Sequence, residues 1–485
     1  MKSFWHGAPG PETNAVAAHR GSAYNPGMDD TPIQLAFEGG TLAVTGATPE
    51  RLTELPYCLH DPRTGVFRAE AIHYRALVEH LRRERIVYED KARAYQPTPW
   101  TLRTSRDPFP HQTEALETWW KSGARGIVVL PTGTGKTFLA VLAIYKAARP
   151  TLVITPTIDL LHQWYAELLA AFDAPVGLIG GGHYEIQPLT VTTYDSAHIH
   201  LDRWGNRFGL VVFDECHHLP GPSYLEAARG SLAPFRLGLT ATPERQDGQE
   251  TLLELMIGPI VYRREIKELA GDFLAEYRAE RLYVELTPEE QQRYQQAREH
   301  YRRFCAEHGI SLSSTNGWQR FIQETCRSRD GRAAFEAYRE QRRLALAAPG
   351  KLQNLEKLLD RHRQDRVLIF TYDNATVYQI SRRFLVPAIT HQTKAKERRH
   401  ILQAFHQGEY NVVVTSRVLN EGVDVPAANI GIILSGSGTV REHVQRLGRL
   451  LRKHGDKQAL LYEVVTRGTA EEFTSERRRQ HHAYR

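Results

Sequence analysis

Residues 131–137 read Pro-Thr-Gly-Thr-Gly-Lys-Thr and lie between the apolar run Ile127–Leu130 and the apolar stretch Phe138–Ala147. This order predicts a buried strand, a glycine-rich loop and the first turn of a helix. Backbone N–H groups of such a loop converge on phosphate oxygens, and the helix N-terminus adds positive potential. We expect Lys136 to reach the terminal phosphates of a nucleotide and Thr137 to hold magnesium. The other loop residues expected to bind the nucleotide are Thr132, Gly133, Thr134 and Gly135.

One position departs from the full phosphate-loop pattern. The first glycine of that pattern would fall at position 130, where this sequence has Leu130. A glycine-rich turn that binds no nucleotide is therefore the alternative interpretation. The combination of Gly133, Gly135, Lys136 and Thr137 between a strand and a helix favours the phosphate site.

Short apolar runs alternate with helical stretches in two parts of the chain. Continuous runs of this kind are typical of strands that are buried on both faces of a parallel sheet. The first group is residues 127–130, 152–155, 210–213 and 237–239, and the second is 367–370, 412–415, 430–434 and 460–464. The pattern therefore predicts an α/β protein with two parallel-sheet lobes.

Five segments are expected along the chain. Residues 1–28 are rich in Gly, Pro and Ala and are expected to form a flexible tail. Two short strands around Gly39-Gly40, followed by a helix, predict a small α+β domain at residues 29–100. We assign residues 101–280 to the first lobe, 281–345 to a charged helical insertion and 346–485 to the second lobe. The insertion is either a solvated surface or a grip on nucleic acid, and the sequence leaves both open. Apolar residues of the expected N-terminal helix are Ala71, Tyr74, Leu77, Val78 and Leu81.

Two adjacent carboxylates, Asp214 and Glu215, stand at the end of the run Leu210–Phe213. We expect Asp214 to orient magnesium through its water shell and Glu215 to polarise the water that attacks the γ-phosphate. Alternation along a strand would point the two side chains apart. Zinc binding by His217-His218 is the weaker alternative, because neighbouring histidines in a strand also point apart and no cysteine pair accompanies them.

Two further motifs extend this chemistry. Thr240-Ala-Thr242 follows the next apolar run, where hydroxyl residues would join the nucleotide site to a strand-binding face. In the second lobe, residues 445–452 read Gln-Arg-Leu-Gly-Arg-Leu-Leu-Arg, so the three arginines share one face of a helix. A guanidinium presented across a cleft can neutralise charge that develops on the γ-phosphate. A merely basic helix is the alternative. The residues given catalytic roles are Glu215, Gln445, Arg449 and Arg452.

Composition limits the class of protein. The 485 residues are 41% hydrophobic and 24% charged, which is ordinary for a soluble globular protein of several domains. No apolar stretch approaches the roughly 20 residues that a membrane-spanning helix needs. Four cysteines without paired spacing argue against a disulfide framework, and we expect a cytoplasmic protein. A formal net charge of +6 suits a polyanionic partner but is weak evidence by itself.

In this order the motifs resemble those of superfamily 2 helicases with two RecA-like lobes, over roughly Phe109–Val465. The resemblance implies ATP and Mg²⁺ as cofactors. Gln112 is similar to the glutamine that contacts adenine. The stretches containing Thr157, Gln163-Trp164 and Thr193 are similar to first-lobe contacts with a nucleic-acid strand. In the second lobe, Thr371 and Thr415 resemble residues that contact the strand, and Glu421 and Asp424 resemble residues that sense nucleotide.

Within that superfamily the sequence most resembles the XPB group, known from DNA repair and transcription initiation. The Asp-Glu-Cys-His motif, the hairpin-plus-helix domain before the motor and the charged insertion between the lobes carry this resemblance. The group has Arg-Glu-Asp just beyond Thr-Ala-Thr, whereas this chain has Arg245-Gln246-Asp247. We expect Arg245 and Asp247 to lie at the nucleic-acid face. The resemblance implies DNA-stimulated ATP hydrolysis with 3′ to 5′ movement on DNA and a role in DNA repair.

Two alternatives remain at this stage. One is the motor subunit of a restriction system, which has the same two lobes but moves duplex DNA for a separate nuclease. The other is a scaffold that binds nucleotide or DNA without turnover. We expect duplex or forked DNA as the main partner and a monomeric protein. No nuclease motif is found in the sequence, so any incision would need a nuclease partner.

Overall fold

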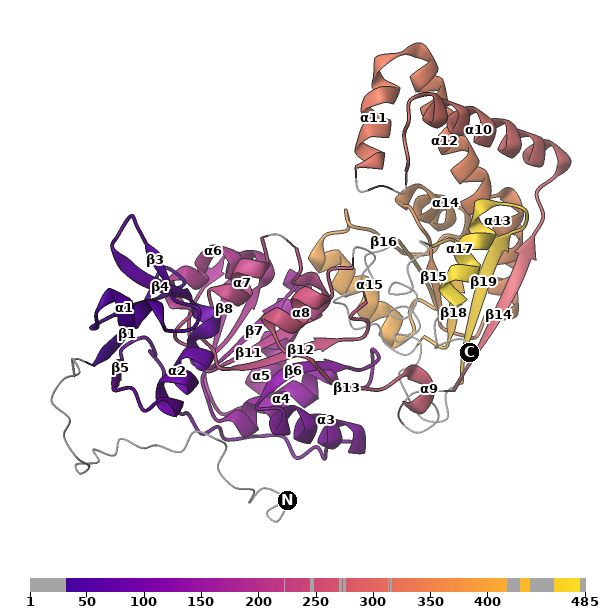
Figure 1. Cartoon of the computed structure of the whole chain (residues 1–485). Coiled ribbons are helices and arrows are strands. Elements are labelled where there is room, and N and C mark those ends of the chain that lie inside the picture. The colour runs from indigo at the N-terminus through magenta and orange to yellow at the C-terminus, as the bar shows by residue number, and fades with distance from the viewer. Residues whose placement is uncertain are drawn as a thin grey trace. The chain divides into compact units, whose positions relative to one another are not determined.

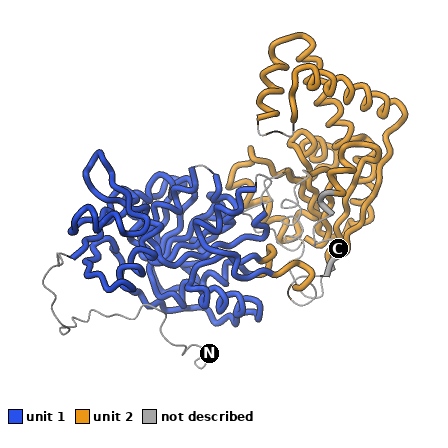
Figure 2. The backbone as a smooth tube through the Cα atoms, viewed as in Figure 1, with its two compact units in different colours: residues 1–129, 135–263 blue, residues 130–134, 264–485 orange. Residues whose placement is uncertain are grey.

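The computed structural model describes residues 32–221, 223–244, 248–269, 273, 276–312, 314, 316–416, 428–436 and 458–479 (Figure 1). The predicted tail at residues 1–28 lies outside them. The chain divides into two compact units. The first contains residues 1–129 and 135–263, and the second contains residues 130–134 and 264–485 (Figure 2).

The N-terminal part of the first unit is a five-stranded sheet with strand order β3-β4-β2-β1-β5. The predicted hairpin is confirmed, because β1 and β2 pair in antiparallel fashion across Gly39 and Gly40, which both adopt positive φ. The helix α2 buries the apolar face that its spacing predicts, including Leu77 and Leu81. The elements are β1 (Ile33–Glu38), β2 (Thr41–Thr45), α1 (Pro49–Thr53), β3 (Leu59–Asp61), β4 (Val66–Glu70), η1 (Ala71–His73), α2 (Tyr74–Arg83) and β5 (Tyr88–Asp90).

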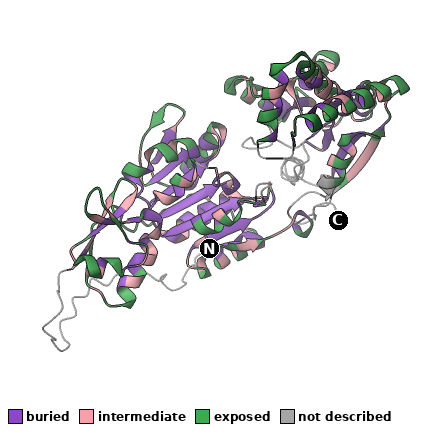
Figure 3. Cartoon of the chain, turned by 45° about the horizontal axis from the view of Figure 1, so that its top comes forward, coloured by how far each residue is buried: buried purple, intermediate pink, exposed green. Residues whose placement is uncertain are grey.

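The rest of the first unit is an eight-stranded sheet with strand order β13-β6-β12-β11-β7-β10-β8-β9. Every pairing is parallel except β8 with β9. Strands β7, β10, β11 and β12 are buried along their whole length, as Figure 3 shows for the centre of this sheet. The elements are α3 (Pro110–Lys121), β6 (Arg125–Val129), α4 (Lys136–Ala147), β7 (Thr151–Thr155), α5 (Ile158–Ala171), β8 (Val176–Gly180), β9 (His183–Tyr184), β10 (Leu189–Thr193), α6 (Tyr194–Trp204), β11 (Leu210–Asp214), η2 (Cys216–His218), α7 (Leu225–Arg229), β12 (Phe235–Thr240), α8 (Thr251–Met256) and β13 (Ile260–Arg263).

The second unit contains a six-stranded parallel sheet with strand order β14-β19-β18-β15-β17-β16. Strand β14 pairs with β19 along its whole length, so the predicted boundary between residues 280 and 281 falls inside a strand of this sheet. The elements are α9 (Ile266–Leu269), β14 (Glu276–Val284), α13 (Pro349–Arg361), β15 (Val367–Phe370), α14 (Asn374–Phe384), β16 (Ala388–Ile389), α15 (Ala395–Gln407), β17 (Val412–Thr415), β18 (Ile430–Ile433), β19 (Gln458–Thr466) and α17 (Ala470–Arg479).

A buried ion pair connects helices α13 and α17 in this unit. The Lys351 ammonium donates to Glu471 Oε2 at 2.6 Å and to the carbonyl oxygens of Leu434 and Val464 at 2.6 and 2.9 Å. Both charged side chains are almost completely buried. Because a buried charge is tolerated only when it is paired and hydrogen-bonded, this cluster fixes the two helices on the ends of β18 and β19.

The insertion consists of three helices, α10 (Pro288–Glu307), α11 (Gly317–Arg327) and α12 (Arg329–Leu346). Thr287 begins α10 with a capping box that includes Glu290, and Ser328 caps α12. The three helices have a small apolar core that includes Phe304 and Phe321. Among the described helices, none is long and apolar enough to cross a membrane. The predicted fold class is confirmed: two parallel-sheet lobes, a small N-terminal domain and a helical insertion.

Candidate functional site

The predicted first-lobe motifs follow neighbouring strands of one parallel sheet. The phosphate loop follows β6, Thr240 ends β12 and Asp214 ends β11, and these three strands are adjacent in the order β6-β12-β11. The carboxyl ends of parallel strands meet at one edge of a sheet, which is where α/β proteins bind ligands. The Lys136 ammonium is close enough to Asp214 to stabilise its carboxylate.

The phosphate loop depends on glycines at two positions. Gly133 and Gly135 have φ values of 91° and 82°, which glycine adopts without strain. A Cβ on Gly135 would lie 2.4 Å from Nε2 of Gln112, so this position also needs a residue without a side chain. The hydroxyl of Thr132 is buried and has no hydrogen-bond partner among the described residues. A phosphate oxygen is a chemically suitable partner for it.

Gln112 connects the start of α3 to this loop. Its side chain is fully buried; Oε1 accepts a hydrogen bond from the Phe109 N–H at 2.9 Å, and Nε2 donates to the Gly135 carbonyl at 3.1 Å. The structure thus places Gln112 directly against the phosphate loop. Its contact with adenine stays a prediction.

Asp214 is held by two aromatic side chains of the first lobe. The indole N–H of Trp164 donates to Asp214 Oδ2 at 2.7 Å, and the Tyr194 hydroxyl donates to the Asp214 carbonyl at 3.1 Å. Burial, followed by the nearby charge of Glu215, raises the pKa of the Asp214 carboxyl to about 6, while Trp164 and Lys136 act in the opposite direction. Trp164 is only 1% exposed. Trp164 is therefore a buried hydrogen-bond partner of Asp214, and the contact of the Gln163-Trp164 stretch with a nucleic-acid strand stays a prediction.

Glu215 has a left-handed backbone, with φ 45° and ψ 53°. The expectation that strand alternation separates Asp214 from Glu215 is therefore wrong, because β11 ends at Asp214 and the chain turns at Glu215. The same turn places His217 and His218 in η2, where their ring centroids are 4.5 Å apart and do not point to opposite faces of a strand. The sequence gives no local signal for this turn.

A histidine links the acidic pair to the neighbouring strand. Nδ1 of the fully buried His217 lies 3.4 Å from Glu215 Oε2 and 3.0 Å from the Thr240 hydroxyl. The Thr240 hydroxyl also accepts a hydrogen bond from the Thr242 N–H at 3.1 Å. A chain of polar contacts therefore runs from Glu215 to the Thr-Ala-Thr segment. The role of His217 in this link was missed from the sequence, where it was considered only as a zinc ligand.

The residues predicted to contact nucleic acid have local partners in the structure. Thr157 follows β7, and its hydroxyl caps α5. Thr193 ends β10, and its hydroxyl caps α6. In the second lobe, Thr371 and Thr415 are fully buried, and the Thr371 N–H donates to the Thr415 carbonyl at 2.9 Å. The two second-lobe threonines thus lie on adjacent strand ends. Other predicted site residues lie outside the described residues: Arg245, Asp247, Glu421, Asp424, Gln445, Arg449 and Arg452.

The chemistry of the sheet edge fits a magnesium ion. Magnesium is bound mainly by oxygen ligands, and this edge offers the carboxylate of Asp214 and the hydroxyl of Thr137, which follows Lys136 in the first turn of α4. Asp214 has a raised pKa because it is buried beside a second carboxylate. A divalent cation would relieve that repulsion.

Three family models match the chain. The model described as "Type III restriction enzyme, res subunit" matches residues 105–245, "ERCC3/RAD25/XPB C-terminal helicase" matches residues 332–483, and "Xeroderma pigmentosum group B helicase damage recognition domain" matches residues 35–92. A relative from Sulfurisphaera tokodaii, named DNA 3'-5' translocase XPB2, is 41% identical over 416 residues, which is 85% of this chain and 94% of the relative. The chain belongs to the XPB family of superfamily 2 helicases.

Other relatives of this XPB family member extend the comparison. The protein named DNA 3'-5' helicase XPB from Kineococcus radiotolerans is 31% identical over 80% of this chain and 64% of its own length. Among solved structures, the Hef helicase domain of Pyrococcus furiosus matches with a TM-score of 0.56 at 20% identity, over 77% of this chain and 98% of that chain. At this identity the likeness to Hef concerns the fold alone.

Proposed function

We propose that this protein is an ATP-driven motor that moves in the 3′ to 5′ direction on DNA, as the names of its XPB relatives state for those proteins. The observation that carries the proposal is the edge of the first sheet. There, Lys136, Asp214 and Glu215 meet at the ends of neighbouring strands, and His217 joins Glu215 to Thr240. These residues suit hydrolysis of a nucleotide. The contact of His217 with Thr240 offers a route by which hydrolysis can affect another face of the first lobe.

The residues of the first lobe are assigned roles by their positions. The loop residues Thr132, Gly133, Thr134 and Gly135 hold phosphate oxygens, and Lys136 stabilises charge on the terminal phosphates. Glu215 orients and polarises the attacking water. When bound, Mg²⁺ neutralises charge on the phosphate oxygens; we propose that Thr137 and Asp214 hold it. Gln112 supports the loop and contacts adenine.

The second lobe completes the site in this proposal. We propose that Arg449 and Arg452, with Gln445, reach the γ-phosphate when the lobes close, so that hydrolysis requires closure. Glu421 and Asp424 sense the bound nucleotide. These five assignments rest on the sequence motifs, since the residues lie outside those that the structure describes.

The nucleic-acid contacts are assigned to the carboxyl ends of strands in both lobes. Thr157 and Thr193 serve the first lobe, and Thr371 and Thr415 serve the second. Arg245 and Asp247 lie just beyond Thr-Ala-Thr, and we propose that they act where strands separate. We also propose a cytoplasmic monomer that works in DNA repair and relies on a separate nuclease for incision. The match of two XPB-specific family models supports this role over that of a restriction motor.

The decisive experiment compares ATP hydrolysis without nucleic acid and with duplex DNA, single-stranded DNA or RNA at equal nucleotide concentration. We expect DNA to stimulate turnover more than RNA does. Lys136→Ala should weaken ATP binding, whereas Glu215→Gln should retain binding and abolish turnover, because only the second variant leaves the phosphate contacts intact. Hydrolysis that persists in Glu215→Gln, or a wild-type rate independent of all three nucleic acids, would reject the proposal.

A further inference from the structure

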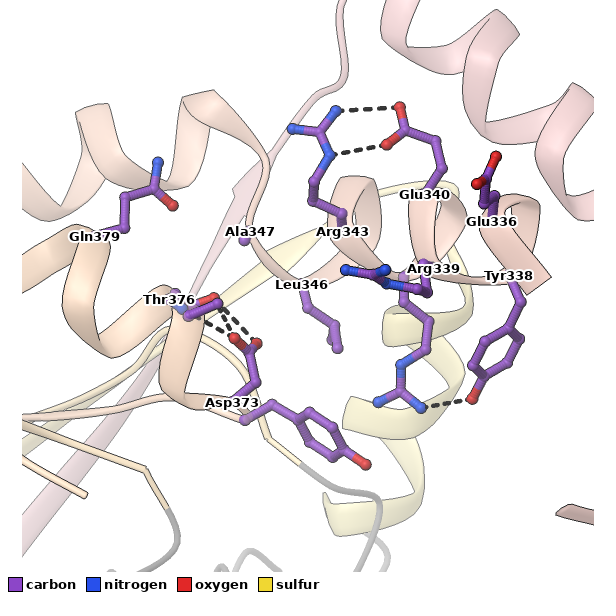
Figure 4. A pocket seen from close by; sticks show the side chains of 13 residues that line it. Glu336, Tyr338, Arg339, Glu340, Arg343, Leu346, Ala347, Asp373, Thr376 and Gln379 are labelled. Carbon is purple, nitrogen blue, oxygen red and sulfur yellow. Dashed lines mark hydrogen bonds and ion pairs between the residues drawn. The ribbon is translucent and has the colours of Figure 1, made fainter. Parts of the chain in front are cut away.

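Tyrosine hydroxyls hold polar groups in both units. Beside a cavity of about 670 Å³ in the second unit, the partly exposed Tyr338 accepts a hydrogen bond from Arg342 at 2.8 Å (Figure 4). In the first lobe the Tyr194 hydroxyl instead donates, and its acceptor is the main-chain carbonyl of Asp214 at 3.1 Å. Tyr194 is only 1% exposed. Its contact is therefore shielded from water, at the edge of the sheet that carries the predicted ATP site.

The Asp214 carbonyl belongs to the peptide unit that joins Asp214 to Glu215. The N–H at the other end of this unit donates to Asp214 Oδ1 at 3.1 Å. Hydrogen bonds thus hold both ends of the unit, and because a peptide unit is planar, they fix its orientation. Rotation of this plane would change ψ of Asp214 and φ of Glu215. The Tyr194 hydroxyl therefore acts directly on the backbone of the residue proposed to polarise the attacking water.

The backbone of Glu215 depends on such support. Its φ of 45° and ψ of 53° lie in the left-handed region, which costs free energy for a residue with a side chain and persists only where surrounding contacts determine it. The turn continues into η2, and the ring centroids of Tyr194 and His218 of η2 are 6.4 Å apart, within the range of aromatic contacts. Tyr194 thus supports the turn through both its hydroxyl and its ring.

The surroundings of Tyr194 keep its hydroxyl protonated. Burial, followed by the neighbouring Cys216 and Asp214, holds the pKa of this hydroxyl well above its ordinary value. The group therefore remains a hydrogen-bond donor at every pH at which the protein is folded and active.

We propose that Tyr194 is a positioning residue for Glu215: its hydroxyl orients the peptide unit so that the Glu215 carboxylate faces the water that attacks the γ-phosphate. This inference rests on the proposed function and deepens it. Tyr194 is the first residue of α6, so it connects the carboxylate to the helix that Thr193, a proposed strand contact, caps. Trp164 has a different task, since it donates to the Asp214 carboxylate rather than to the main chain.

The test uses the full chain with Tyr194→Phe, which removes the hydroxyl and keeps the ring. The matched control is Tyr224→Phe. The Tyr224 ring lies 5.3 Å from the Tyr194 ring, but its hydroxyl donates to Asp195 Oδ1 at 2.9 Å. ATP hydrolysis is measured with and without duplex DNA, and anisotropy gives the affinity for labelled DNA. Because a misplacement of about 1 Å can cost about 100-fold in rate, we expect kcat of Tyr194→Phe to fall by about 10- to 100-fold.

The other parameters separate positioning from a merely structural role. KM for ATP, the Mg²⁺ requirement and the affinity for DNA should match those of the wild type, because the partner of the hydroxyl is a main-chain carbonyl and not the carboxylate proposed to hold Mg²⁺. Partial unfolding of the lobe would instead impair all of them together. Tyr224→Phe should resemble the wild type in every measurement.

The outcomes also separate this inference from the proposed function. A wild type that DNA stimulates, together with a Tyr194→Phe variant whose kcat equals that of Tyr224→Phe, would overturn the inference and leave the motor assignment intact. A wild type without a response to DNA would reject the motor assignment, and basal kcat would still test the position of Glu215. Urea titrations report folding. A Tyr194→Phe chain that does not fold would count against the inference, because the hydroxyl would then serve the stability of the lobe.

Discussion

Replacing Trp164 with phenylalanine removes one N–H group from the candidate ATP site while keeping an aromatic ring in the core. In the structure that group donates to Asp214 Oδ2 at 2.7 Å from a side chain that is 1% exposed. A hydrogen bond to an ionised group contributes about 1.5–3 kcal/mol. This donor also fixes the orientation of the carboxylate, and loss of an outer partner of a metal ligand typically lowers metal affinity by about 10- to 100-fold, so the affinity for Mg²⁺ should fall by about that factor.

The same substitution should change the pH dependence of hydrolysis. Burial and Glu215 raise the pKa of the Asp214 carboxyl to about 6, and the Trp164 donor limits that rise by stabilising the ionised form. Asp214 must be ionised to hold Mg²⁺. Loss of the donor raises the pKa further, so activity should be lost at a higher pH as the solution is acidified.

The assay is DNA-stimulated ATP hydrolysis measured against Mg²⁺ concentration and against pH. Trp204→Phe is the matched control: Trp204 is 2% exposed in the same lobe, and its indole nitrogen has no hydrogen-bond partner among the described residues. Both variants lose the same volume, but only Trp164→Phe loses a contact with Asp214. If the two folded variants need the same Mg²⁺ concentration and lose activity at the same acidic pH, the positioning role of Trp164 is refuted.

Three other predictions address coupling, turnover and stability. His217→Ala should lower the DNA-stimulated part of hydrolysis more than the basal part, because it breaks the link from Glu215 to Thr240; equal loss in both rates would contradict this. Arg449→Ala should leave ATP binding largely unchanged and reduce turnover at least tenfold, and a loss of affinity at unchanged maximal rate would argue for a ground-state contact. Lys351→Met should reduce the free energy of unfolding by about 3–5 kcal/mol in urea titrations, since it leaves a buried carboxylate without its cation; a change below 1 kcal/mol would be inconsistent with the pair's burial.

Sequence patterns predicted the strands that are covered on both faces of their sheet. Strands β7, β11, β15 and β17 are short apolar runs and were expected at nearly the observed positions. Strand β14, with the sequence Glu-Tyr-Arg-Ala-Glu-Arg-Leu-Tyr-Val, was not expected as one element. Among the described strands it lies at the edge of its sheet, with a neighbour on one side only, so it tolerates charged residues and shows no continuous apolar run.

The candidate site was predictable where local sequence determines position. The phosphate loop and the acidic pair follow strands of one sheet, and parallel strands bring such ends together. The contacts of these residues were less predictable. Trp164 and Asp214 are 50 positions apart, and their hydrogen bond depends on how α5 packs on the sheet. The left-handed backbone at Glu215 is rare for a residue with a side chain, so its orientation was mistaken.

The ion pair between Lys351 and Glu471 bears on the order in which the lobes form during synthesis. The described elements of the first unit are all made by residue 263, and that unit can acquire its sheet while the rest of the chain is still being translated. The second lobe differs. Lys351 is synthesised 120 residues before Glu471, whose carboxylate neutralises its ammonium, and β18 and β19, which also contact the ammonium through Leu434 and Val464, are made in between. A ribosome-bound chain that stops short of α17 should therefore have a protease-resistant first lobe and a second lobe that is still open to cleavage.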